Sequence, residues 1–167
     1  MMKLTVLIIL VSGLLMADSG TWKSFQSEGK LFTASFPCTS KNMLVNKNDF
    51  LTERQYKCEA DGATYSLTQI VLTDAGKKAL DTKPSTLVED TSRDLQQKYR
   101  NEKQTIMLHK IFRQPPYYRL EMIAGADKKK NYTSIFDGPK GRIIFSASGP
   151  EKEDANMKKA SDSIKPN

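Results

Sequence analysis

Apolar and polar residues alternate along much of the first half of the chain, a pattern typical of half-buried strands. The clearest case is Leu31–Phe36, in which every second residue is apolar. A strand is also predicted over Trp22–Gln26, joined to the first by a turn at residues 27–30. Pro37 ends the Leu31–Phe36 strand because proline lacks a backbone N–H. We expect a polar loop from Thr39 onward.

A β-hairpin is the strongest local prediction. Two alternating segments, Phe50–Ala60 and Ala63–Leu72, flank the dipeptide Asp61-Gly62. This dipeptide suits a type I′ turn, because both central residues of that turn need a positive φ. The resulting register gathers the apolar side chains of both strands on one face, and its facing pairs are Cys58 with Tyr65 and Tyr56 with Leu67.

After a connector at residues 73–83, the apolar period changes to that of a helix. Thr86 and Glu89 have capping-box spacing, and apolar positions then recur at helical intervals to about Arg100. Turn-rich segments separate four further strands and a last helix, namely Gln104–Phe112, Tyr117–Ala124, Tyr132–Asp137, Gly141–Ser148 and Glu151–Ile164. We therefore predict an α+β fold: an antiparallel β-sheet of about six to eight strands with one mid-chain helix and one C-terminal helix.

The N-terminus has the proportions of a secretory signal peptide. Lys3 precedes the 14-residue apolar run Leu4–Ala17, which would span about 21 Å as a helix, against roughly 30 Å for a hydrocarbon core. We predict a signal peptide over residues 1–19 and a single α+β domain over residues 20–167, starting near Gly20 or, alternatively, Asp18. The other interpretation is a buried N-terminal helix. The protein is expected to be secreted or periplasmic.

The positive charge of the chain is concentrated in one segment. Residues 98–142 hold 11 basic and 4 acidic groups, whereas residues 18–97 hold 10 basic and 11 acidic groups. A concentrated basic field attracts acidic proteins, polysaccharides, membrane surfaces or nucleic acids. The alternative interpretation is a surface that only keeps the protein soluble.

Two cysteines, Cys38 and Cys58, form an even count, which in an exported chain favours a disulfide. Pairing would close a loop of about 20 residues and stabilise the fold by roughly 3 kcal/mol. A zinc site would need clustered histidines, and the spacing does not match a redox Cys-x-x-Cys motif.

Catalytic chemistry is poorly represented. His109 is the one histidine, and the Gly-x-Ser-x-Gly context of a hydrolase nucleophile is missing. We expect His109 to be a structural or surface residue, and we predict no enzymatic activity, no catalytic residue, no metal site and no cofactor. A hydrolase with a dispersed site would instead need a deep pocket near His109.

Two segments of the basic region suit partner recognition. Arg113-Gln-Pro-Pro-Tyr-Tyr-Arg119 combines a rigid backbone with arginine and tyrosine, which are common interface anchors. The second segment is a run of three lysines. The predicted partner-binding residues are Arg113, Tyr117, Tyr118, Arg119, Lys128, Lys129 and Lys130. The alternative for the first segment is a rigid turn with core tyrosines. Asn131 begins a glycosylation sequon, a short pattern that often occurs by chance.

The order of elements resembles the PsbP-like fold family. The points of similarity are an N-terminal Trp-x-x-Phe beginning at Trp22, the segment Leu31-Phe-Thr-Ala-Ser-Phe-Pro37, the strand ending Phe145-Ser-Ala-Ser148, and the final helix ending Ala160-Ser-Asp-Ser-Ile164. The resemblance covers nearly all of the expected mature chain. It implies a module that binds or assembles and does not catalyse. It supplies no ligand residues for this sequence.

Together these features predict an exported, non-enzymatic binding or assembly module that engages an anionic partner through residues 98–142. The expected partner is an acidic protein, a polysaccharide or a membrane surface, and export disfavours nucleic acid. The alternatives are the hydrolase described above and a structural envelope or stress protein without a specific ligand.

Overall fold

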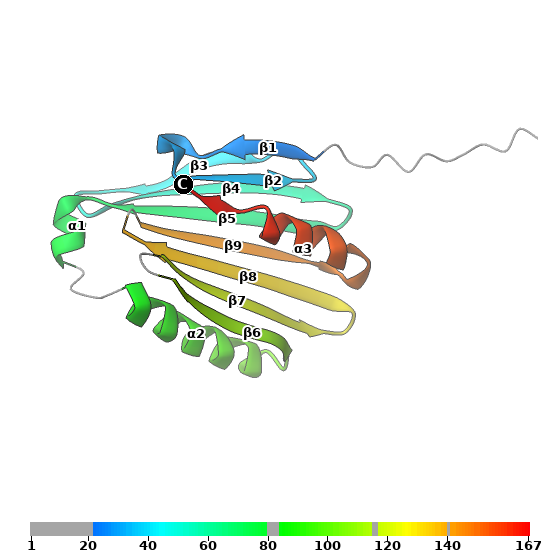
Figure 1. Ribbon diagram of the computed structural model, residues 1–167. Helices are drawn as coiled ribbons and strands as arrows, with labels where there is room; N and C mark the ends of the chain where they lie inside the picture. Colours follow the sequence, from blue (N-terminus) through cyan, green and yellow to red (C-terminus); the bar gives the residue numbers. More distant parts are fainter. Residues whose placement is uncertain (1–21, 80–83, 115–116, 140) are drawn as a thin grey trace, which may run out of the picture.

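A seven-stranded antiparallel sheet, in the order β3-β4-β5-β9-β8-β7-β6, forms the centre of the computed structural model (Figure 1). The structure describes residues 22–79, 84–114, 117–139 and 141–167. The strands of this sheet are β3 (Lys41–Lys47), β4 (Leu51–Ala60), β5 (Ala63–Leu72), β6 (Thr105–Gln114), β7 (Tyr117–Ala126), β8 (Lys129–Gly138) and β9 (Gly141–Pro150). A second sheet, in the order β1-β2-β10, contains β1 (Lys23–Gln26), β2 (Phe32–Phe36) and β10 (Lys165–Pro166).

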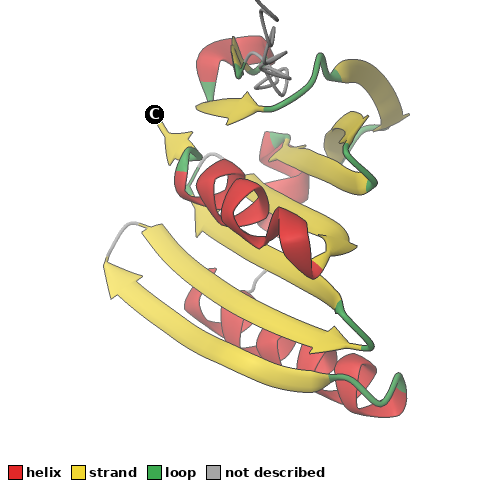
Figure 2. Cartoon of the chain, turned by 90° about the vertical axis from the view of Figure 1, so that its right-hand side faces the viewer, coloured by secondary structure: helices red, strands yellow, loops and turns green. Residues whose placement is uncertain are grey.

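The helices are α1 (Asp74–Ala79), α2 (Pro84–Asn101) and α3 (Asp154–Asp162), with short 3₁₀ turns η1 (Glu28–Lys30) and η2 (Glu151–Glu153). Of these, α2 and α3 lie on opposite faces of the large sheet (Figure 2). Figure 2 shows α3 in front of the strands and α2 behind them. α2 packs on β6, β7 and β8, whereas α3 packs on β8 and β9.

Because side chains alternate along each strand, the sheet has two separate apolar cores. One lies beneath α3 and the small sheet and includes Phe36, Tyr65 and Phe145, all fully buried or nearly so. The other lies beneath α2 and includes Val88, Leu120 and Ile135. Adjacent residues of one strand therefore serve different faces of the molecule, which decides where each candidate binding residue points.

The predicted hairpin is present with the predicted register. Cys58 pairs with Tyr65 and Tyr56 pairs with Leu67. Asp61 and Gly62 have φ values of +52° and +79°, as a type I′ turn requires. Turn chemistry and apolar alternation agree at this point, so local sequence alone determines the pairing.

The α+β class is confirmed, with differences at the ends of elements. The mid-chain helix begins at Pro84, two residues before the predicted Thr86. The loop predicted over residues 125–130 is instead a two-residue turn at Asp127 and Lys128, whose φ values are +48° and +62°. Lys129 and Lys130 consequently belong to strand β8.

Three elements contradict the sequence prediction. The expected polar loop after Thr39 contains strand β3, all of whose residues are exposed, so it has no alternating pattern to reveal it. The connector at residues 73–83 contains α1, whose first turn is capped where the Thr73 Oγ1 accepts a hydrogen bond from the Gly76 N–H at 3.1 Å. The last helix ends at Asp162, because the following residues form β10 against β2.

The proposed signal peptide at residues 1–19 lies outside the described residues. It stays a prediction, as does the assignment of residues 20–167 to one domain. Among the described residues, no helix combines the length and apolarity that a membrane span requires.

Candidate functional site

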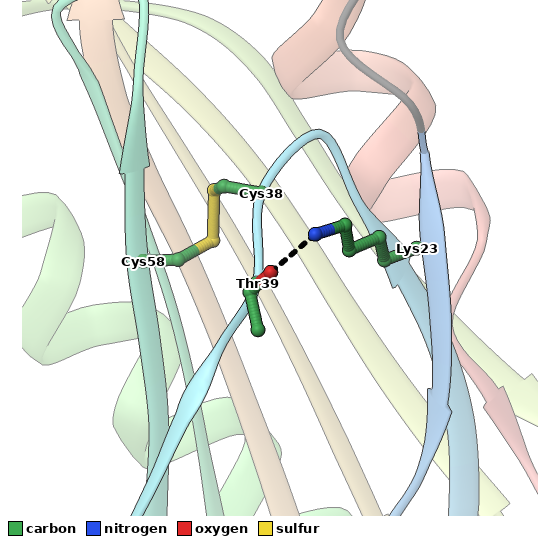
Figure 3. The surroundings of a disulfide bond; sticks show 4 residues. All are labelled: Lys23, Cys38, Thr39 and Cys58. Carbon is green, nitrogen blue, oxygen red and sulfur yellow. Dashed lines mark hydrogen bonds between the residues drawn. A yellow bond between two sulfur atoms is a disulfide. The ribbon is translucent and has the colours of Figure 1, made fainter.

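A disulfide joins Cys38, just after β2, to Cys58 in β4 (Figure 3). The two Cα atoms are 5.9 Å apart. Next to it, the Lys23 ammonium donates a hydrogen bond to the Thr39 hydroxyl at 2.5 Å (Figure 3). These contacts hold the chain beside the start of β3.

The Arg113–Arg119 segment does not form one surface, because the sheet divides it. Arg113 lies on the α2 side, where its guanidinium donates to the Glu89 carboxylate at 2.8 Å. Arg119 lies on the opposite face, stacked 4.7 Å from the ring centre of Phe136 and ion-paired with Glu121. Tyr118 packs against the core beneath α2. The side chain of Tyr117 lies outside the described part of the chain.

Lys130 is also already engaged. Its ammonium lies 3.1 Å from the Asp154 carboxylate and 3.7 Å from Glu151. Although partial burial acts to raise the pKa of Asp154, hydrogen bonds from the Tyr132 hydroxyl and the Lys130 ammonium lower it below its ordinary value. The charge of Lys130 is therefore largely neutralised within the fold.

Exposed cations gather instead where three chain reversals meet, a region that we call the basic end. It contains Arg100, Lys103, Lys128, Lys129 and Lys152, all exposed. The register brings Thr105 opposite Gly125, and the Glu151 N–H donates to the Lys128 carbonyl at 2.8 Å. The α2–β6, β7–β8 and β9–η2 reversals thus lie at the same end of the sheet.

The carboxylates near the basic end pair with Lys98 and Lys130, so the cations of the basic end are largely unpaired. Glu102 lies 4.0 Å from Lys98, and Glu151 and Asp154 share Lys130. Among the described residues, no carboxylate lies within ion-pair distance of Lys128 or Lys129. Of the six predicted partner-binding residues whose side chains the structure describes, Lys128 and Lys129 are exposed and unpaired.

Two lysines of the basic end occupy left-handed backbone, where glycine is favoured. Lys103, with a φ of +55°, follows α2. Its N–H donates to the Arg100 carbonyl at 3.0 Å, and the Gln104 N–H donates to the Tyr99 carbonyl at 2.8 Å, which is a Schellman motif. Lys128 has a φ of +62° in the β7–β8 turn. Each costs about 1 kcal/mol relative to glycine.

A groove of about 320 Å³, lined by more apolar than polar surface, lies beside the basic end, between α2 and strands β5 and β9. Lys98 and Glu102 border it at the end of α2. Hydroxyl and amide side chains supply most of the remaining polar lining, namely Thr64, Ser66, Ser146, Ser148, Gln104 and Asn131. Such groups can form hydrogen bonds with a polar ligand that extends from the basic end.

His109 is exposed, and its Nε2 lies 2.7 Å from the Ser92 Oγ. Ser92 is only 3% exposed, and its hydroxyl also accepts a hydrogen bond from the Gln96 side chain at 3.3 Å. The pair therefore ties β6 to α2 and does not present a serine nucleophile to a substrate. The described residues contain no group of three or more metal-ligating side chains.

Comparison with known proteins identifies the fold. No family model matches the sequence, and no curated protein matches it. Among solved structures, the solution structure of cyanobacterial PsbP (CyanoP) from Synechocystis sp. PCC 6803 is similar, with a TM-score of 0.53 and 8% sequence identity. The match covers 89% of this chain and 94% of that chain. At this identity the likeness shows the fold alone, and the chain has a PsbP-like fold.

Proposed function

We propose that this chain is an exported, non-enzymatic binding or assembly module that captures an anionic partner through the basic end. The observation that carries the proposal is the gathering of five exposed cations from three reversals, while Arg113, Arg119 and Lys130 are ion-paired elsewhere. The disulfide fits an oxidising compartment, and a PsbP-like fold fits an accessory module.

The neighbouring groove favours an acidic polysaccharide over the other anionic partners. An extended glycan can place its acidic groups on the lysines and its hydroxyls against Thr64, Ser66 and Ser146. A flat bilayer cannot enter such a groove. The contact would depend strongly on salt, because exposed charges are screened beyond a Debye length of about 8 Å at physiological ionic strength.

The test compares the mature protein with the triple variant Lys103→Gln/Lys128→Gln/Lys129→Gln. Binding to immobilised heparin, used as a polyanionic probe, should weaken at least tenfold at low salt and show a smaller salt dependence. A matched control, Lys30→Gln/Lys78→Gln/Lys165→Gln, removes three exposed lysines away from the basic end and should bind as the unchanged protein does.

Two further binding measurements distinguish the partners. Vesicles containing phosphatidylglycerol represent a membrane surface, and polyglutamate represents an acidic protein. Equal loss of heparin binding in the triple variant and the control would overturn the assignment to the basic end. Tighter binding to vesicles than to heparin would replace polysaccharide with a membrane surface as the partner, and tighter binding to polyglutamate would replace it with an acidic protein.

A further inference from the structure

The strand β3 forms one edge of the seven-stranded sheet (Figure 1), and the side chains of all its residues are exposed. Its centre is apolar: Met43, Leu44 and Val45 are 45%, 52% and 53% exposed. An edge strand also presents unpaired backbone N–H and C=O groups, which can accept another strand. Soluble proteins usually protect such an edge.

The opposite edge strand, β6, shows what protection looks like in this same sheet. α2 covers one face of β6, and the centre of β6 carries the polar residues His109 and Lys110. Both edges contain a bulge, between Leu44 and Asn46 in β3 and between Ile106 and Leu108 in β6. The difference is therefore the apolar, uncovered centre of β3.

The charges around β3 disfavour a second copy of the chain as its partner. Antiparallel pairing of two β3 strands about Leu44 would set Lys41 of each copy against Lys47 of the other. Like charges directly opposite each other destabilise a strand pair. At the Lys41 end, Lys57 of β4 stands in register beside Lys41, so two cations meet there.

The disulfide restrains the chain at the start of this edge strand. Cys38 lies three residues before β3 and is bonded to Cys58, the neighbour of Lys57 in β4. The start of β3 is thus anchored before any partner arrives. An edge that is already ordered loses less conformational entropy on binding.

We propose that β3 binds an extended segment of a partner protein by strand addition. The segment runs antiparallel to β3, has alternate apolar residues at its centre that pack against Leu44 on one face of the sheet, and carries acidic residues at its carboxyl end, opposite Lys41. β3 has seven residues, so the contact spans about 23 Å. This surface is separate from the basic end and does not rest on its role.

The probe is a labelled peptide, Thr-Val-Thr-Val-Thr-Val-Glu-Glu, and its binding is followed by fluorescence anisotropy. Leu44→Asn should weaken binding at least fivefold. Met107→Asn on β6 is the matched control, because Met107 is also 52% exposed on an edge strand, and it should change binding less than twofold. Lys41→Glu should weaken binding more than Lys47→Glu does.

A peptide with alternate backbone amides methylated on one edge tests for strand pairing itself. Methylation on the pairing edge should abolish binding, whereas methylation on the other edge should leave it intact. Equal binding of both methylated peptides, no binding of the unmodified peptide, or a dimer that Leu44→Asn dissociates would each overturn the proposal. The triple lysine variant of the basic end should bind the peptide normally, which separates this result from the heparin experiment.

Discussion

The β3 edge and the basic end are two exposed surfaces of one sheet that use different physical forces. The β3 edge has apolar side chains and unpaired backbone groups, and a disulfide orders its start. The basic end has exposed lysines on strained turns. β8 lies four strands from β3, which is about 19 Å at 4.8 Å per strand. Because this exceeds the Debye length, the two surfaces should respond independently to mutation and salt.

Removal of the disulfide should have the largest effect and should act unequally on the two surfaces. Cys38→Ala/Cys58→Ala should lower the free energy of unfolding by roughly 3 kcal/mol in urea denaturation, because the loop between the cysteines is no longer closed. At a temperature where the variant stays folded, binding of the probe peptide should weaken more than heparin binding. Equal weakening of both would show that the disulfide does not specifically order the β3 edge.

Glycine at the two strained lysines should change stability and binding in opposite directions. Lys103→Gly/Lys128→Gly should raise the free energy of unfolding by about 1 kcal/mol per site, because glycine adopts positive φ without strain. Heparin binding should nevertheless weaken, since two cations are lost, and peptide binding should not change. The measurements are urea denaturation and titration of each probe.

Lys30→Gly is the control for this variant. Lys30 is exposed with a φ of +53° but lies in η1, away from the basic end. The variant Lys30→Gly should raise the free energy of unfolding by about 1 kcal/mol and leave heparin binding unchanged. A comparable loss of heparin binding in Lys30→Gly would contradict a specific role for the basic end.

The smallest expected effect concerns Asp154, which neutralises Lys130 at the margin of the basic end. Its pKa is lowered in the folded state, so its contribution to stability is present above about pH 4 and is lost as the pH falls through the folded pKa. Asp154→Asn should therefore flatten the decline of the free energy of unfolding below pH 4. It should also release Lys130 and strengthen heparin binding about twofold at pH 7.

The asparagine keeps a side-chain oxygen that can accept the hydrogen bond from the Tyr132 hydroxyl, now made to Asp154 at 2.6 Å. A change in peptide binding at β3 would contradict the independence of the two surfaces. Unchanged heparin binding would mean that Lys130 stays engaged by Glu151 alone.

Local sequence determined the parts of this protein that depend on neighbouring residues. The Asp61-Gly62 turn and the alternation on both sides of it determined the β4–β5 register, and helical spacing placed most of α2. The even cysteine count indicated the pairing of Cys38 with Cys58. These features depend on periodicity, turn chemistry and loop closure, so they can be predicted from the sequence alone.

The tertiary structure alone decided which surfaces are available for binding. Alternation across the sheet sent Arg113 and Arg119 to opposite faces, and Lys130 met Asp154 through packing of α3 near the end of β8. The fully exposed β3 has no periodic signal, and it pairs because β4 lies beside it. Sequence showed that the chain carries excess positive charge, but ion pairs between distant segments decided which charges remain free.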